Sequence, residues 1–153
     1  MLQRIQTLYL LISLILVALL FFFPFADILS AEGKLYSFHF NGLHYAELNE
    51  LYIQTIPSII LLIVILLLNI VTIFLFKKRI IQMRIAFINM LLKLGFVGLG
   101  YFYVSNFSSN LEADAVSYKL YAVMPFIAVI FSYLAIRAIG KDEALVRSID
   151  RIR

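Results

Sequence analysis

The chain has 153 residues, of which 63% are hydrophobic and 14% are charged, and its formal net charge is +4. A soluble domain has about 45–50% apolar and about 25% charged residues, so a chain this short cannot hide its apolar surface in a water-facing core. The absence of cysteine excludes disulfides, thiolate metal sites and thiol redox chemistry. The composition therefore indicates one integral membrane domain, residues 1–153.

Four apolar stretches are long enough to cross a bilayer as helices. Crossing about 30 Å of hydrocarbon at 1.5 Å per residue takes about 20 residues, within a usual range of about 17–25. The sequence therefore predicts an all-α membrane protein, a bundle of four transmembrane helices. The expected spans are 8–25, 56–76, 85–104 and 120–136. The first is interpreted as a retained anchor, because its apolar run exceeds the about 7–15 residues of a secretion signal.

The loop between the first two spans carries the pattern of a β-hairpin at 35–48. Asn41-Gly42 lies between two strand-like runs and suits a type I′ turn, because both central residues of that turn need φ > 0. The strand pairs expected from it are Phe40–Leu43, His39–His44 and Phe38–Tyr45. The side chains expected on its apolar face are those of Tyr36, Phe38, Phe40, Leu43 and Tyr45. The loop between the last two spans, 105–119, is polar and mildly acidic, and its Ser-Asn-rich start is predicted to be a plain connector.

Two facing histidines in this hairpin, His39 and His44, are weak candidates for zinc ligands. Two ligands are too few for a metal site, and Glu47 alternates to the opposite face. We therefore expect a polar cross-strand pair rather than a metal centre. No metal and no other cofactor is expected for the chain.

The basic residues predict the orientation, because Lys and Arg beside membrane spans stay on the cytoplasmic side. Ten of the 13 basic residues lie on one side: Arg4, Lys77, Lys78, Arg79, Arg84, Arg137, Lys141, Arg147, Arg151 and Arg153. The opposite loops hold Lys34 and Lys119 among several acidic residues. Both termini are therefore predicted to be cytoplasmic, and the net charge needs no nucleic-acid partner to explain it.

Polar residues inside the spans form a candidate ligand-binding cluster of Asn69, Asn89 and Lys93. Asn89 lies one turn before Lys93 on the same helical face, and Asn69 lies at a similar depth, roughly 10–12 Å from the cytoplasmic edge. An ionisable group at that depth suggests a relay or a counter-ion for a ligand. The alternative is that Lys93 extends its amino group to the inner interface while the asparagines join helices by hydrogen bonds.

The C-terminal segment, residues 140–153, has apolar residues at helical spacing and is predicted to form a cytoplasmic amphipathic helix. Such a helix lies on anionic lipid headgroups or docks on a partner protein. The residues expected to contact a partner or the membrane surface are Arg4, Leu145, Arg147, Ile149 and Arg151.

Several motifs resemble a known family. They are the opening Leu2-Gln-Arg-Ile-Gln-Thr-Leu-Tyr-Leu10, the run Phe21-Phe-Phe-Pro24, the segment Ala135-Ile-Arg-Ala-Ile-Gly-Lys-Asp-Glu-Ala-Leu-Val-Arg147, and Asp150-Arg-Ile-Arg153. The chain resembles domain-of-unknown-function family 4293, small four-span inner-membrane proteins of Gram-negative bacteria. The resemblance implies the same topology and a bacterial inner membrane, and it implies no activity.

The function expected from these features is non-enzymatic. The spans contain no histidine and no carboxylate, and the chain has no Gly-rich phosphate loop and no Ser-His-Asp set. We expect an accessory or assembly subunit of a larger membrane complex, with the lipid bilayer and other membrane proteins as partners. The alternative is a carrier of a small ligand, lipid or ion that uses Asn69, Asn89 and Lys93.

Overall fold

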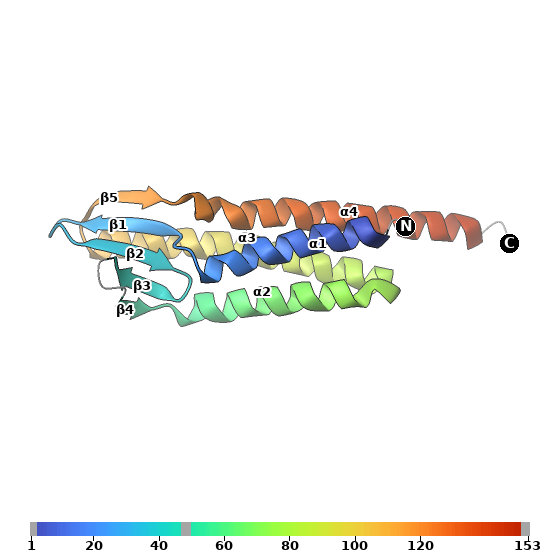
Figure 1. The fold of residues 1–153 in the computed structure, drawn as a ribbon, viewed down its shortest axis with the longest axis horizontal. Coiled ribbons are helices and arrows are strands. Elements are labelled where there is room, and N and C mark those ends of the chain that lie inside the picture. Colours follow the sequence, from blue (N-terminus) through green and yellow to red (C-terminus); the bar gives the residue numbers. More distant parts are fainter. Residues whose placement is uncertain (1–2, 47–49, 151–153) are drawn as a thin grey trace.

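The computed structural model describes residues 3–46 and 50–150, without the side chains of Gln3, Arg4, Lys77, Arg147, Ile149 and Asp150. Within this range, four α-helices lie side by side along one axis and a β-sheet covers one end of them (Figure 1). Both described chain ends and the link between the second and third helices lie at the other end (Figure 1). We call these two regions the sheet end and the termini end.

The helices alternate in direction along the chain. The α-helices are α1 (Gln3–Ala18), α2 (Ile56–Phe74), α3 (Arg79–Asn110) and α4 (Met124–Asp150). Short 3-10 segments extend three of them: η1 (Leu19–Phe21), η2 (Leu75–Lys77) and η3 (Leu120–Val123). Both α1 and α3 contact α2 and α4, so the helices form a closed ring around a shared interior.

Within the described residues, three helical segments are long and apolar enough to cross a membrane: Ile56–Phe74, Arg79–Asn110 and Leu120–Val146. The first predicted span, 8–25, ends four residues earlier than expected and begins earlier too, because its apolar helix covers Ile5–Phe21. The chain leaves the helix before Pro24, whose ring disfavours the α conformation in the preceding residue. The strand that follows begins at Ala26.

The outer surface of the helical part is apolar, unlike that of a soluble protein. Its outward faces expose large apolar side chains such as Ile60, Leu67 and Phe74, whereas Asn69 and Lys93 are buried inside. An apolar exterior of this extent matches lipid rather than water. The three segments of membrane length and the apolar exterior agree with the prediction of a membrane protein.

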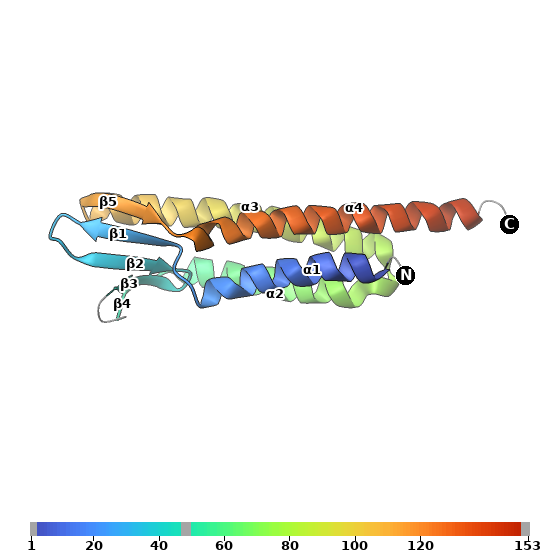
Figure 2. The same cartoon turned by 45° about the horizontal axis from the view of Figure 1, so that its top comes forward.

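The sheet has five antiparallel strands in the order β4-β3-β2-β1-β5 (Figure 2). The strands are β1 (Ala26–Ser30), β2 (Leu35–His39), β3 (Gly42–Tyr45), β4 (Leu51–Gln54) and β5 (Ala113–Tyr118). The hairpin predicted at 35–48 is thus part of a larger sheet, and the prediction of a plain connector at the start of 105–119 is wrong, because that stretch continues α3 and leads into β5. The flanking strands are short, and β5 carries Asp114 and Ser117 rather than a clear apolar alternation, so the sequence signal for them is weak.

The hairpin of β2 and β3 forms, but its predicted register is wrong. Phe38 pairs with Leu43 and His39 with Gly42, so Phe40-Asn41 rather than Asn41-Gly42 forms the turn. The shift moves each partner by two residues, which keeps every side chain on its predicted face. Phe38 and Leu43 are buried as expected.

Gly42 explains the shift because it belongs to the strand and not to the turn. Its φ is +148°, and a Cβ there would lie 2.1 Å from the carbonyl oxygen of Ile53 in β4. The sequence shows a glycine at position 42, which suggests a turn. The structure shows instead that a glycine is needed there because β4 approaches closely. The hairpin sequence alone does not reveal that neighbour.

One face of the sheet packs on the last turns of α3. Phe38 of β2 lies 5.8 Å from Phe107, centroid to centroid, and Val104 and Ile28 complete the same buried cluster. At 1.5 Å per residue the 32 residues of α3 are about 48 Å long, which exceeds a hydrocarbon core of about 30 Å. The predicted span 85–104 is thus the middle of a longer helix that also supports the sheet.

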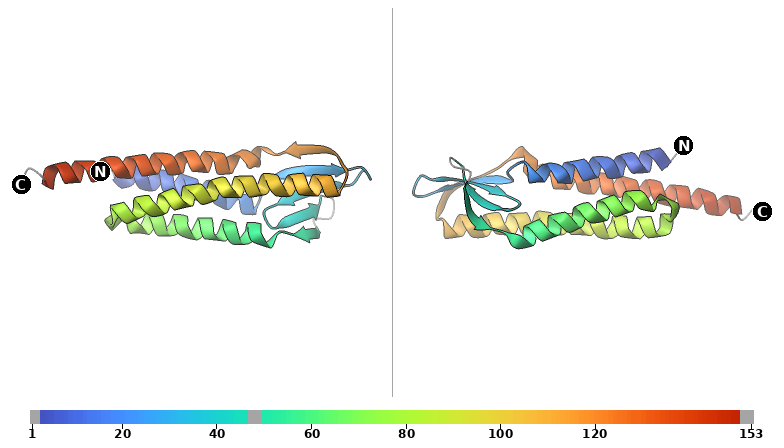
Figure 3. Two further views of the ribbon diagram at one scale, coloured as in Figure 1. Left: turned by 180° about the vertical axis from the view of Figure 1, so that it is seen from behind. Right: turned by 60° about the horizontal axis from the view of Figure 1, so that its bottom comes forward.

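The predicted separate C-terminal helix, 140–153, is not a separate element. Helix α4 continues without a break from Met124 through Gly140 to Asp150 and projects past the other helices (Figure 3). A glycine inside a helix costs only about 1 kcal/mol, which the neighbouring turns outweigh. Residues 151–153 of that prediction lie outside the described residues.

We expect Gly42→Ala to separate β4 from β3, because its methyl group would overlap the Ile53 carbonyl oxygen. Hydrogen exchange of the β3 and β4 amides should accelerate, while exchange in the helices stays unchanged. The control is Gly33→Asn: Gly33 has φ +76° with open space around its Cβ position, and Asn tolerates that conformation. Equal protection in wild type and Gly42→Ala would contradict the assigned approach of β4.

Candidate functional site

The interior of the helical part contains buried polar side chains among its apolar core residues. The polar side chains come from all four helices and include Gln6, Ser13, Ser58, Asn69, Thr72, Gln82, Asn89, Lys93, Ser132 and Asp142. On α3 the residues Gln82, Asn89 and Lys93 recur at intervals of seven and four, which places them on one helical face. The predicted site residues Asn69, Asn89 and Lys93 all belong to this interior.

Lys93 is 1% exposed and joins α3 to two other helices. Its Nζ donates hydrogen bonds to the hydroxyl of Ser13 in α1, at 2.7 Å, and of Ser132 in α4, at 2.8 Å. The two hydroxyl oxygens lie 3.0 Å apart, and each serine also reaches the Ala128 carbonyl oxygen, at 3.0 and 2.9 Å. We call Lys93, Ser13 and Ser132 the lysine network.

The lysine network contradicts one of the two sequence interpretations of Lys93 and leaves the other, a role in ligand binding, as a prediction. Lys93 does not extend to the inner interface, because its amino group is enclosed by α1 and α4. Within the described residues, its hydrogen bonds go to serines and not to Asn69, beside which it was expected. The two serines were missed because a single serine in an apolar span gives no signal by itself. Their positions on the buried faces of α1 and α4 are visible only once the helices are packed.

In the part of the chain that the structure describes, Asn69 and two other buried polar side chains lack some of their hydrogen bonds. Among the described residues, the amide nitrogen and oxygen of Asn69, the Asn89 Oδ1 and the Gln82 Oε1 are buried without a hydrogen-bond partner. An unsatisfied buried polar group costs about 1–3 kcal/mol. Gln82 is otherwise anchored, because its Nε2 donates to the Thr72 carbonyl oxygen of α2 at 2.9 Å. These groups are ready to accept a polar guest, such as a buried water.

The histidine pair lies on the sheet face that points away from the helices. The rings of His39 and His44 are 5.0 Å apart, and His44 Nε2 lies 3.1 Å from the Asn41 side-chain oxygen. Burial, and then the nearby His44, lower the pKa of His39. No group of three or more histidine, aspartate or glutamate side chains that could hold a metal ion occurs within the described part of the chain.

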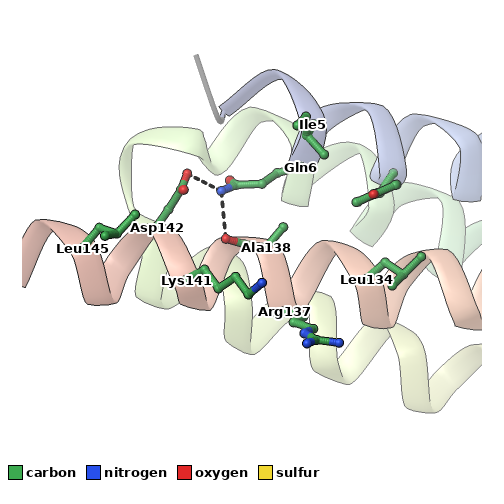
Figure 4. A pocket seen from close by; sticks show the side chains of 9 residues that line it. Ile5, Gln6, Leu134, Arg137, Ala138, Lys141, Asp142 and Leu145 are labelled. Carbon is green, nitrogen blue, oxygen red and sulfur yellow. Dashed lines mark hydrogen bonds between the residues drawn. The ribbon is translucent and has the colours of Figure 1, made fainter.

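At the termini end, α1 and α4 enclose a groove of about 480 Å³ (Figure 4). On its floor, Gln6 Nε2 donates to the Asp142 carboxylate and, at 3.2 Å, to the Ala138 carbonyl oxygen. The residues that line it are Ile5, Gln6, Tyr9, Leu134, Arg137, Ala138, Lys141, Asp142 and Leu145. Of the predicted surface residues, Leu145 borders this groove. The side chains of Arg4, Arg147 and Ile149 and the whole of Arg151 lie outside what the structure describes.

A second hollow, of about 610 Å³, lies on the other flank of the α4 end, beside the link between α2 and α3. It mixes apolar and charged side chains. Its lining residues are Phe76, Lys78, Arg79, Ile80, Ile81, Glu143 and Val146. Arg79 ties this side of α4 to the ring, because its guanidinium donates to the Asp142 carbonyl oxygen at 3.3 Å.

Three apolar helices of membrane length, a polar interior and a five-stranded cap define a mostly helical protein of membrane type. The chain belongs to the family described as Domain of unknown function (DUF4293), which matches residues 2–152, essentially the whole chain. The resemblance seen in the sequence is thereby confirmed. Comparison with curated proteins finds no match.

The lysine network predicts a distinctive mutational cycle. Ser13→Ala combined with Ser132→Ala should destabilise the protein by about 1–3 kcal/mol, because it leaves the buried Lys93 amino group without its acceptors. Adding Lys93→Met should restore most of that loss, since no polar group is then left unpaired. Unfolding in mixed detergent micelles measures both changes. An additive loss in the triple variant would contradict the network, and Ser105→Ala, at an exposed position, is the control.

Proposed function

We propose that this chain is a non-enzymatic, four-span protein of the bacterial inner membrane that serves as an accessory or assembly subunit of a larger membrane complex. The observation that carries the proposal is the free end of α4. It projects past the other helices (Figure 3) and exposes Leu145 and Val146, which are 53% and 40% accessible. Exposed apolar side chains beside the basic end of a helix ring are suited to contact another protein.

The fourth span is supported by the surroundings of α1. Its apolar stretch, Ile5–Phe21, is close to the lower limit of about 17 residues for a span. It packs against α2 and α4, both of membrane length, and an apolar helix between two spans faces the same lipid. A short span is accommodated by local thinning of the bilayer at modest cost.

The orientation is supported by the distribution of charge over the two ends. Of the ten basic residues predicted to be cytoplasmic, the eight within the described ranges belong to the start of α1, to the α2–α3 link with the start of α3, and to the second half of α4, which point to the termini end (Figure 1). The sheet end carries acidic side chains such as Asp114 and Glu32. By the positive-inside rule, the termini end is cytoplasmic and the sheet is extracytoplasmic. The bacterial inner membrane is what the family resemblance implies.

Cysteine labelling tests this topology cleanly, because the chain has no cysteine of its own. In intact cells, a membrane-impermeant maleimide should label Ser109→Cys at the sheet end and should not label Ser148→Cys at the termini end. Both side chains are exposed, so accessibility to the reagent depends on the side of the membrane. Labelling of Ser148→Cys in sealed cells, with Ser109→Cys unreactive, would reverse the proposed orientation.

The docking surface comprises the projecting part of α4 and the hollow beside the α2–α3 link. The hollow offers Ile80, Ile81 and Val146 for apolar contact and Lys78 and Arg79 for acidic groups of a partner. This mixture of an apolar centre and a charged border is the usual anatomy of a protein interface. The partner that matches it is another membrane protein with a cytoplasmic segment that carries both apolar and acidic residues.

Site-specific crosslinking tests the proposal. A photoreactive residue at Val146 should capture one partner stoichiometrically in cells, whereas the same probe at Ile63 should not. Ile63 is equally apolar and exposed but lies in the middle of α2, where lipid is the expected neighbour. Val146→Glu should reduce co-purification of the partner by about tenfold, equivalent to about 1.4 kcal/mol, without lowering abundance of the chain. A chain that purifies alone and crosslinks to no protein would contradict the accessory role.

The alternative, a carrier of a small ligand, lipid or ion, is favoured by one observation. Both side-chain amide atoms of Asn69, and the side-chain oxygens of Asn89 and Gln82, are buried without a hydrogen-bond partner among the described residues. A polar guest that binds between α2 and α3 would satisfy them. Native mass spectrometry of the purified chain separates the two functions. A bound small molecule that is lost in Asn69→Leu supports the carrier, and a bound protein supports the accessory subunit.

A further inference from the structure

We propose that the groove between α1 and α4 is a binding site for one anionic phospholipid of the cytoplasmic leaflet, with Arg137 and Lys141 holding its phosphate. The proposal rests on the membrane orientation proposed above, but it does not depend on a protein partner. Three features support it: the direction of the Arg137 and Lys141 side chains, the exposed apolar face of α4 next to them, and the groove between α1 and α4.

Two cations, Arg137 and Lys141, and one carboxylate, Asp142, line the groove, so it keeps an excess of one positive charge. Its acidic residue, Asp142, is 7% exposed and is turned to Gln6 on the floor, whereas Lys141 extends along α4 toward Arg137 (Figure 4). Arg137 and Lys141 are both exposed, and neither makes an ion pair with any residue that the structure describes. Two cations four residues apart on a helix repel one another. An anion between them removes that repulsion.

A phosphate suits the two side chains chemically. The planar guanidinium of an arginine presents parallel N–H donors to two phosphate oxygens, and a lysine adds a mobile point charge. Basic pockets between membrane helices at the cytoplasmic side are typical sites for anionic headgroups. Inorganic phosphate would satisfy this part of the groove as well as a lipid headgroup, so the remaining surface decides between them.

The same face of α4 becomes apolar immediately beyond Arg137. Tyr133, Ile130 and Phe126 follow at helical spacing, and each is about half exposed. The distance from Arg137 to Phe126 along the helix is about 16 Å, close to the half-thickness of a hydrocarbon core, about 15 Å. A polar head and a long apolar tail are therefore matched by one continuous surface.

The groove itself adds depth to this surface. Leu134 of α4 and Tyr9 of α1 line it, and Tyr9 packs on Phe131 with ring centroids 6.1 Å apart. Because Tyr9 and Phe131 close the contact between α1 and α4 beyond Leu134, an acyl chain that leaves the headgroup at Arg137 runs past Leu134 and over the exposed face of α4. A soluble anion would gain no free energy from these apolar side chains, whereas an amphiphilic molecule would. We therefore infer that the ligand is an amphiphile.

The test uses the full-length chain in detergent with equal amounts of phosphatidylglycerol and phosphatidylethanolamine, followed by native mass spectrometry. We expect about one retained phosphatidylglycerol per chain, with a preference over phosphatidylethanolamine of roughly tenfold. Arg137→Gln combined with Lys141→Gln should abolish the preference. The matched control is Lys78→Gln combined with Arg84→Gln, which removes two exposed charges from the same end and should leave it intact.

Three results would overturn the inference. They are equal retention of both lipids by the wild type, loss of the preference in the control variant, and displacement of phosphatidylglycerol by millimolar inorganic phosphate. The last would identify an anion site without a role for the acyl chains. None of these outcomes bears on the protein partner, so failure of the lipid site and failure of the accessory role are distinguishable.

Discussion

The lysine network fixes the relation of three helices in a setting where apolar packing gives little direction. Against lipid, helices gain almost nothing from burying leucine on leucine, because the acyl chains are as apolar as the side chains. A buried amino group is different, because it has to find its acceptors inside the protein. Ser13 and Ser132 provide them from α1 and α4, so Lys93 specifies which faces of α1, α3 and α4 meet.

Helix α2 is held by other means. At the termini end the Gln82 side chain reaches the Thr72 carbonyl oxygen, and at the sheet end Thr55 donates to the Phe40 carbonyl oxygen at 3.0 Å. Between these points Asn69 is 0% exposed and has no partner among the described residues. The contact of α2 with α3 is therefore the part of the interior with most to gain from a bound water or ligand. This lack of hydrogen bonds at Asn69 is the physical reason for considering a carrier function.

The two ends of the molecule differ in how they are closed. At the sheet end, aromatic side chains of β2 and α3 pack together, and the Asp27 carboxylate forms an ion pair with Lys119 at 2.5 Å across neighbouring elements. At the termini end, α4 continues past its neighbours and separates two hollows. Both are lined by apolar side chains together with two cations and one carboxylate, and they differ in their neighbours: the first lies against α1 and the second against the α2–α3 link. The proposed lipid and protein contacts both lie there because that end offers unfilled surface.

The sequence by itself determined the class of protein, the approximate position of three long apolar helices, the hairpin face that is buried and the family. These features depend on composition and on local periodicity, which a single stretch of chain carries. It could also single out Lys93, since a lone lysine in an apolar stretch stands out. The serines that bind it, the register set by Gly42, the three additional strands and the continuity of α4 depend on neighbours distant in the chain. Only the tertiary structure decided them, because a hydroxyl, a missing Cβ or an unpaired strand acquires its role from the group placed opposite it.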